Sequence, residues 1–420
     1  MAVDEVSKPS LAGSVGAGVA QSLARLPKLH RASWWVKVIV IFVASRVVTT
    51  TLLLAYARIQ PANAWTPASP DYFSFAKIWD GHWYYIIAMV GYPSELPLTA
   101  DGHVGESAWA FMPAYPGLVR LVMLFTTLDF ATAAVIVSVG FALAAALMFY
   151  KLMSLVLPSS TALFAVVLFC FAPLSPIMQV AYAESMHAFF LTLALYLLLQ
   201  RRYWLLLPVI AVMAVTRPSG LAFALALLLH VVHRWWVRQR DPFPMGERVA
   251  SIVVGLFSAF MGIAWLLIAW GVTGSFTAYT DTELAWRAPY VGYGELVPFT
   301  PWFQAAEFWA PWIGMPVPLA MALLVLLILG FGALLFTPAA KRLGPDLRFW
   351  LASYGLYLLA VFFPQSSTFR LLMPLFPALG ILAQPKSPWY RVALVLLFIA
   401  GQWGWVHIGW WVNGYDWSPP

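Results

Sequence analysis

The chain has 420 residues, of which 62% are hydrophobic and only 10% are charged, whereas about a quarter of a typical soluble domain is charged. With a mean hydropathy of +0.80 over its whole length, it cannot bury its apolar residues in one water-soluble core, so lipid must cover many of them. Its single cysteine, Cys170, excludes a disulfide framework and a cysteine-rich metal site.

The net charge of +7 comes from 24 Lys and Arg against 17 Asp and Glu. The basic residues gather in short hydrophilic breaks between apolar runs, as topology signals do, so nucleic acid is not an expected partner. Residues 1–30 are small and polar and contain no apolar run, which favours a disordered cytoplasmic tail over a cleaved signal peptide. Residues 31–420 are expected to form a single transmembrane domain.

Along the rest of the chain, apolar runs approach the length of a bilayer-spanning helix, which is about 20 residues. Eleven runs qualify, several of them short: 34–56, 131–150, 161–180, 185–200, 203–217, 219–237, 249–271, 316–338, 348–363, 370–384 and 390–412. We therefore expect an all-α polytopic membrane protein.

Residues 109–127 are a poor twelfth span because they contain Pro113, Pro116 and Arg120. If this segment crossed the membrane, every later loop would invert and the basic residues would face outward. The positive-inside rule therefore favours eleven spans, with the N-terminus cytoplasmic and the C-terminus outside.

This topology gives two long outer loops, at about 57–130 and 272–315, which hold many of the acidic and aromatic residues. Loops longer than about 12–15 residues are usually functional or disordered. In the first loop, residues 75–90 predict an amphipathic helix lying in the membrane interface, and 109–127 predict a re-entrant or interfacial piece.

The first loop contains Asp80, in the segment Trp79-Asp80-Gly81-His82-Trp83-Tyr84. Aromatic neighbours near the lipid headgroups disfavour the ionised carboxylate by desolvation, which would make it a usable general base. The alternative is an interfacial helix whose acid only faces water. His82 could orient an acceptor or contact a phosphate, although an interfacial hydrogen bond is the simpler role.

Three further charged residues lie at predicted outer helix ends: Glu184, Arg217 and Arg370. An acid at membrane depth is expensive and often functional, although a carboxylate at a helix start is also favoured by the helix dipole. Arginine binds phosphate through planar, bidentate contacts, so both arginines suit a lipid phosphate, with snorkelling to the headgroups as the alternative. Arg370 is the stronger candidate because the polar segment 364–368 precedes it closely in the chain and would give a polar approach to its side chain.

Two other polar residues fall within the apolar runs. Arg46, inside the first predicted span, is expected to pair with a neighbouring helix, since an unpaired charge at that depth costs several kcal/mol, and contact with substrate is the alternative. His187 follows Glu184 by three residues, which places both on one helix face. Because the chain has no second such pair, we expect no metal site.

Nucleotide-binding motifs are absent. The sequence has no P-loop, no dinucleotide-binding glycine fingerprint after a strand and no GxSxG elbow. An ATP-driven pump or an enzyme of soluble nucleotides is therefore unsupported, and the short cytoplasmic loops offer no domain for a sugar nucleotide.

The segment from Trp79 to Ala88, followed by Gly91-Tyr92, resembles the signature of the PIG-V-like (GPI mannosyltransferase II-like) mannosyltransferases, integral-membrane enzymes of the GT-C class. Further stretches match the family's motifs in the expected order. The resemblance covers roughly residues 34–235, and one weaker motif matches after residue 235. These stretches are Ala110 to Pro116, Ala181 to Ser185, Thr216 to Gly220 and Phe369 to Pro374.

The resemblance implies a GT-C-type helical bundle that takes sugar from a polyprenyl phosphate on the outer face and transfers it with inversion. It implies that Asp80 deprotonates the acceptor hydroxyl, and that neither a nucleotide nor an essential metal is needed. The implied donor is polyprenyl-phosphate-mannose, and the implied acceptor is a glycolipid or lipid-anchored glycan among the membrane lipids. His82 and Trp83 depart from some family versions. With Tyr84, Glu184, Arg217 and Arg370 they are the expected substrate-binding residues.

Other functions remain open from the sequence. Another prenyl-phosphate-linked hexose or pentose would use the same fold. A polyprenyl-lipid transporter or flippase is a second class, although the chain lacks matching halves with broken helices. A scaffold for other membrane enzymes would make Asp80 dispensable. The Trp-rich segment from Trp403 to Trp417 has no role that the resemblance supplies.

Overall fold

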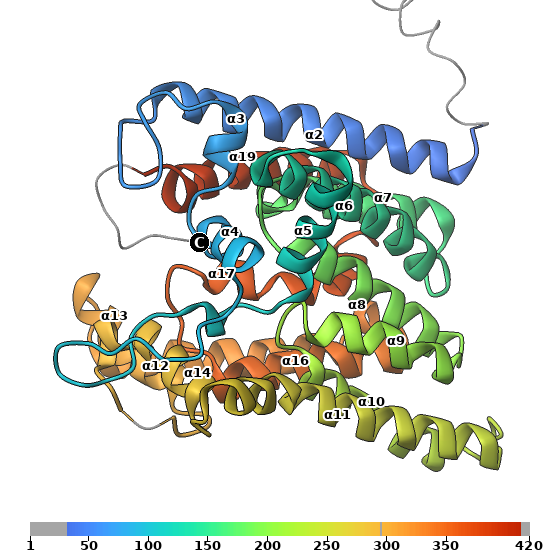
Figure 1. Ribbon diagram of the computed structural model, residues 1–420. Helices are drawn as coiled ribbons and strands as arrows, with labels where there is room; N and C mark the ends of the chain where they lie inside the picture. Colours follow the sequence, from blue (N-terminus) through green and yellow to red (C-terminus); the bar gives the residue numbers. More distant parts are fainter. Residues whose placement is uncertain (1–31, 295, 413–420) are drawn as a thin grey trace, which may run out of the picture.

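The computed structural model describes residues 32–294 and 296–412 (Figure 1). The tail predicted for residues 1–30 lies outside the described residues. Within them, regular structure is helical, and the one extended pairing is the isolated bridge between Leu98 and Val104. The predicted all-α class is confirmed.

The helices follow one another with short connections, except around the two predicted outer loops. In chain order they are α2 (Trp34–Ile59), α3 (Tyr72–Ala76), α4 (Asp80–Val90), η2 (Ala108–Ala110), α5 (Ala114–Thr126), α6 (Phe130–Ser154), α7 (Ser159–Phe171), η3 (Ser175–Gln179), α8 (Glu184–Leu199), α9 (Tyr203–Ala214), α10 (Gly220–Trp236), α11 (Met245–Thr273), α12 (Ala278–Val291), α13 (Pro301–Trp312), α14 (Val317–Leu334), α15 (Pro338–Lys341), α16 (Pro345–Val361), α17 (Thr368–Leu371), η4 (Met373–Ala378), α18 (Leu379–Leu382), α19 (Pro388–Trp405) and η5 (Val406–Trp410).

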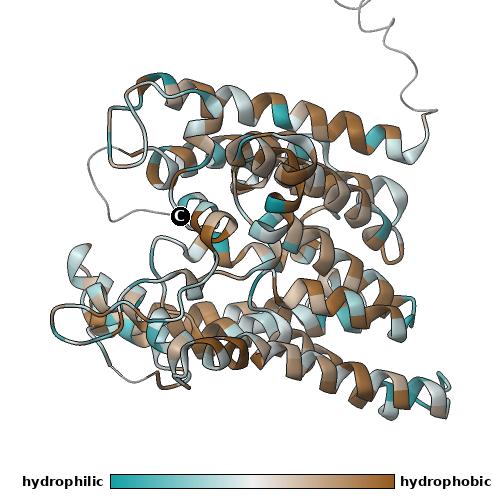
Figure 2. Ribbon diagram, in the orientation of Figure 1, coloured by the Kyte–Doolittle hydropathy of each residue, from teal (hydrophilic) through white to brown (hydrophobic). Residues whose placement is uncertain are grey.

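Among the described residues, five helices are long and apolar enough to cross a membrane, judged by length and composition: α2, α6, α11, α14 and α19 extended to Trp410. Figure 2 shows hydrophobic residues along most of α11 and hydrophilic residues at its start. The segment 109–127 forms α5, which is one of the shorter apolar helices. The predicted total of eleven spans stays a prediction.

The helices form a bundle whose two ends differ (Figure 1). At one end lie α3, α4, α12, α13 and the long loops, and at the other lie the short α8–α9 and α10–α11 connections. The two loops predicted to face outward therefore share one end of the bundle. Helices α4 and α5 lie between the pair α2 and α19 and the pair α10 and α11.

The prediction of a continuous helix over 161–180 is wrong, since α7 ends at Phe171 and η3 begins at Ser175, and Ala172, which precedes Pro173, has an extended ψ of 148°.

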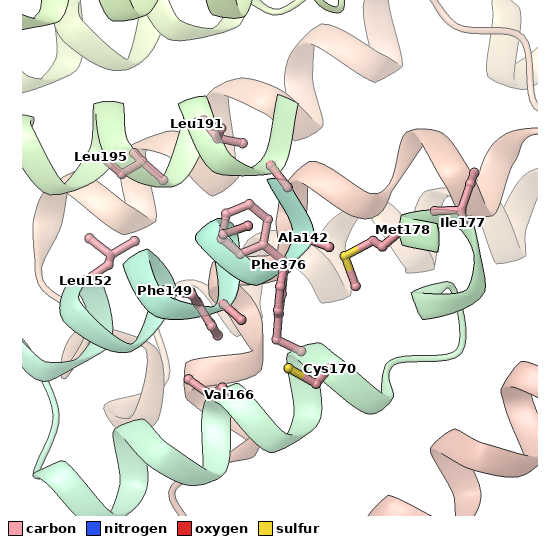
Figure 3. Packing of buried hydrophobic residues seen from close by; sticks show 14 of the residues in the cluster. Ala142, Phe149, Leu152, Val166, Cys170, Ile177, Met178, Leu191, Leu195 and Phe376 are labelled. Atoms are coloured by element: carbon pink, nitrogen blue, oxygen red, sulfur yellow. The ribbon is translucent and has the colours of Figure 1, made fainter. Parts of the chain in front are cut away.

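The prediction of one continuous helix over 370–384 is also wrong. This stretch forms α17, the 3-10 turn η4 and the single turn α18, because Pro374 and Pro377 remove backbone donors from a regular helix. The broken segment runs inside the bundle, where Phe376 lies among residues of α6, α7 and α8 (Figure 3). The Phe376 ring packs edge-on against Phe149 and Phe169, with centroids 5.3 and 5.5 Å away.

Arg46 is held by the last turn of α7 and the segment that follows it. Nη1 donates to the carbonyl of Ser175 at 3.0 Å, and Nη2 donates to the carbonyl of Cys170 at 2.9 Å. The last carbonyls of a helix lack partners inside the helix and attract a cation. The expected partner on a neighbouring helix is therefore a set of backbone carbonyls, and Arg46 has a structural role.

Helices α10 and α11 approach each other at backbone distance. A Cβ atom built on Gly220 would lie 2.6 Å from the nitrogen of Gly262 and 2.7 Å from its Cα. Ser258 also donates a hydrogen bond to the carbonyl of Gly220 at 2.8 Å. Only glycine fits this crossing, since backbone atoms cannot move aside as a flexible side chain could.

Replacing Gly220 with alanine is therefore expected to lower stability by about 1–3 kcal/mol, the usual cost of overpacking. The matched control is Gly271→Ala on α11, where an added Cβ meets nothing within 4 Å. Thermal unfolding in detergent should show a clear drop in Tm for Gly220→Ala and none for the control. Equal Tm values for the two variants would mean that the helices do not cross this closely.

Candidate active site

Asp80 is the first residue of α4, directly after a sharp corner. The helix predicted over 75–90 is divided there, since α3 ends at Ala76 and α4 starts at Asp80. Trp79, between them, has φ 60° and ψ −126°, a conformation that a residue with a bulky side chain rarely adopts. Such strain costs about 1–3 kcal/mol and persists only where the surrounding structure imposes it.

Packing from two distant segments holds this corner. The indole of Trp79 donates to the carbonyl of Trp410 at 3.3 Å, and the indole of Trp410 donates to the carbonyl of Phe75 at 3.1 Å. On the other side, a Cβ on Gly81 would lie 3.3 Å from the Cβ of Ala181. The glycine after Asp80 thus allows the helix start to lie against the segment that precedes α8.

The carboxylate of Asp80 belongs to a row of alternating charges. Arg370, on α17, donates from Nη1 to Oδ2 of Asp80, and its Nε lies 3.7 Å from Oε1 of Glu184. The same Glu184 oxygen accepts a hydrogen bond of 2.7 Å from Nη1 of Arg217. The structure therefore brings together four of the predicted site residues, from four separate parts of the chain.

This row of charges is largely buried. The side-chain exposed fractions are 13% for Asp80, 10% for Arg370, 3% for Glu184 and 16% for Arg217. Buried ions lose their hydration and are stable only when they are paired. Two carboxylates and two guanidinium groups balance each other in charge, and Glu184 also starts α8, where the helix dipole favours an anion.

Two polar atoms of the charge row lack a hydrogen-bond partner. Oε2 of Glu184 and Nε of Arg370 have no hydrogen-bond partner. A pocket beside them is lined by Glu184, Arg217, Arg370, His187 and residues of α16 and η4, and its free volume of about 10 Å³ holds roughly one water molecule. Substrate could enter this pocket only if the surrounding segments moved.

The other predicted residues on α4 point in different directions. Tyr84 is buried beneath the charges and packs against Tyr115 and Tyr182. Trp83 stacks on Phe111, with centroids 5.6 Å apart, and meets Trp286 of α12 edge-on at 5.8 Å.

His82 faces outward from the charge row, beside Tyr85. Burial and the charge of Lys77 lower the pKa of His82, which favours the neutral ring. Asp80 forms its ion pair with Arg370 and not with His82, and the predicted contact of His82 with substrate stays a prediction.

Glu283, on α12, is a carboxylate near the site that the sequence did not single out. Tyr279, Glu283 and Trp286 follow helical spacing on one face, and Trp286 contacts Trp83 of α4. Glu283 therefore faces the volume between α12 and α4, and it interacts electrostatically with Arg217, Arg370 and Asp80. The spacing from Tyr279 to Trp286 was the signal that could have found it.

Burial raises the pKa of Glu283 to about 7 from an ordinary 4.5, although Tyr279 and the arginines oppose this shift. Between those pH values the folded protein keeps a proton that the unfolded chain loses, so stability falls as pH rises and levels off above about pH 7. The loss is at most about 3 kcal/mol. Glu283→Gln should remove this part of the dependence, seen as a smaller fall in Tm from pH 5 to pH 8.

Glu95→Gln, at an exposed position of the first outer loop, is the matched control and should keep the wild-type fall in Tm. Parallel Tm curves for Glu283→Gln and the wild type would show that Glu283 does not hold its proton at neutral pH.

A second hollow lies beyond α3, between α3, α4 and the start of α6. It has a free volume of about 390 Å³ and is lined by Phe73, Lys77, Tyr85 and the helix-capping acids Asp71 and Asp129, among others. Within the described ranges, no group of three or more His, Cys, Asp or Glu side chains could hold a metal ion.

Similarity to known proteins is found among solved structures, and not among family models or curated sequences. No family model matches the sequence, and no curated protein matches it. Among solved structures, an oligosaccharyltransferase from Archaeoglobus fulgidus, tethered through a disulfide to an acceptor peptide containing the NVT sequon, is 13% identical with a TM-score of 0.38. The match covers 85% of this chain and 53% of the other, so the chain spans about half of that protein's length. A similarity at this level assigns neither a fold family nor an activity.

Proposed function

We propose that the protein is a glycosyltransferase that moves mannose from polyprenyl-phosphate-mannose to a lipid-anchored glycan on the non-cytoplasmic face of the membrane. The observation that carries this proposal is the placement of Asp80. Its carboxylate lies at a strained corner, paired with Arg370 and backed by Glu184 and Arg217. The proposed substrate class comes from the motifs that resemble PIG-V-like enzymes. The proposed GT-C fold comes from the same motifs.

In the proposed reaction, the acceptor hydroxyl oxygen bonds to the anomeric carbon of mannose, and the bond from that carbon to the phosphate oxygen breaks. The hydroxyl proton passes to Asp80, and polyprenyl phosphate leaves with the electron pair. Attack opposite the leaving group inverts the anomeric centre. Arg370 already lies beside Asp80 and would stabilise the charge that develops on the phosphate.

The same geometry suggests how the base becomes available. While Arg370 is bound to Asp80, the carboxylate shares its charge with the guanidinium group. A phosphate that draws Arg370 toward itself would release Asp80 for the acceptor hydroxyl. Proton acceptance would then depend on the presence of the donor, which would protect the sugar from transfer to water.

The test is to incubate membranes that contain the protein with labelled polyprenyl-phosphate-mannose and to identify the labelled product. A mannosylated lipid that is absent from membranes without the protein is the expected result. A product that forms only from another prenyl-phosphate sugar would exclude mannose. Movement of unchanged donor between leaflets, with no product, would favour the flippase alternative.

A further inference from the structure

Arg287, on α12, lies outside the charge row. The residue is only 6% exposed, yet Nε and Nη1 have no hydrogen-bond partner. Nη2 donates to the side-chain oxygen of Gln304 on α13, and the guanidinium carbon lies 5.4 Å from the centroid of the Phe363 ring. Among the residues that the structure describes, no carboxylate forms an ion pair with Arg287.

Burying the cation of Arg287 without a counter-charge has a high cost in free energy. Removing a charge from water costs several kcal/mol unless a counter-charge and hydrogen bonds replace the lost hydration. Arg370 has carboxylates for this purpose, and Arg46 has backbone carbonyls. Arg287 has one amide oxygen and an aromatic ring, which leaves its charge uncompensated. An anion from outside the chain would supply what is missing.

The surroundings of Arg287 indicate where that anion comes from. Helix α13 exposes Phe303 and Trp312, at 39% and 75%, and aromatic residues of this kind are typical of the membrane interface. The indole of Trp309, also on α13, donates to the carbonyl of Pro364 at 2.8 Å. Arg287 is therefore covered by an aromatic helix that suits the depth of lipid headgroups.

We propose that Arg287 and Gln304 bind the phosphate group of a membrane lipid. Arginine suits phosphate because its planar group offers several N–H donors. The oxygen of Gln304 already accepts from Nη2, so its amide NH2 group is left as a further donor. This site does not depend on the chemistry proposed for Asp80, and either proposal can fail alone.

Thermal unfolding of the purified full-length protein in a phosphate-free maltoside detergent tests the site. Added phosphatidylglycerol should raise the Tm of the wild type by a few degrees, since a ligand that binds only the folded state stabilises it. Arg287→Gln should abolish this increase. Arg58→Gln, at an exposed arginine near the end of α2, is the matched control and should keep it.

A second variant covers the case in which Arg287→Gln does not fold. Gln304→Glu puts a carboxylate beside Arg287, so it should raise the Tm without lipid and abolish the increase with lipid. Retention of the full lipid effect in either folded variant would overturn the proposal. An equal increase with inorganic phosphate at the same concentration would overturn the lipid as the source.

Discussion

Asp80→Asn is expected to reduce sugar transfer by about 10²- to 10⁴-fold, the usual contribution of a general base. The amide keeps the size of the side chain but cannot take the proton of the acceptor hydroxyl. Initial rates with labelled polyprenyl-phosphate-mannose, in membranes with equal amounts of protein, give the measurement. Asp80→Glu keeps a carboxylate one methylene farther out and should retain more activity than the amide.

Asp101→Asn is the matched control, since Asp101 is an exposed acid of the same outer loop and lies outside the charge row. It should transfer sugar at the wild-type rate. If folded Asp80→Asn protein did so as well, the base assignment would be wrong, and a scaffold or a flippase would explain the protein better.

Arg370→Met is expected to have the largest effect on stability. It leaves Asp80 without its partner and removes one of the two cations beside Glu184. Breaking a buried ion pair from one side costs about 3–5 kcal/mol, so the Tm should fall by many degrees. Arg370→Lys keeps the positive charge and should lose less.

A double-mutant cycle separates the ion pair from general damage. If Arg370 stabilises the fold through Asp80, the loss from Arg370→Met should be smaller when Asp80 is already Asn. Equal losses in both backgrounds would mean that the two side chains do not interact in the folded protein.

The sequence predicts the helical class well, and it singles out the charged residues that the structure brings together, since both depend on local signals. Apolar runs predict helices, and acids and arginines at helix ends are conspicuous in a chain with so few charges. The sequence does not predict which of these charged side chains form ion pairs with one another. Asp80 and Arg370 are 290 residues apart, and their contact depends on how the whole bundle closes.

The three wrong helix predictions, over 75–90, 161–180 and 370–384, have causes that a hydropathy profile does not show. The segment 370–384 is apolar enough for a span, but its prolines and the burial of Phe376 among α6, α7 and α8 favour a broken path. The segment 75–90 has the periodicity of one helix, but tertiary contacts hold Trp79 at a positive φ. The spacing from Tyr279 to Trp286 places Glu283 on the aromatic face of α12, but only the packing of α12 against α4 brings that face to the charge row.

The hydrogen bonds that join Trp79 and Phe75 to Trp410 set an order of assembly. Trp79 and Trp410 are 331 residues apart, so the corner before Asp80 gains its support only after α19 and the turn η5 that follows it have been synthesised. Gln60, directly after α2, forms hydrogen bonds of 2.6 and 3.1 Å with Val412. These bonds can likewise form only after the C-terminal part of the chain has been synthesised. A nascent chain that has inserted its early helices would therefore still lack a supported reaction centre. Under the proposed function, completion of the fold would thus precede any transfer of a lipid-linked sugar.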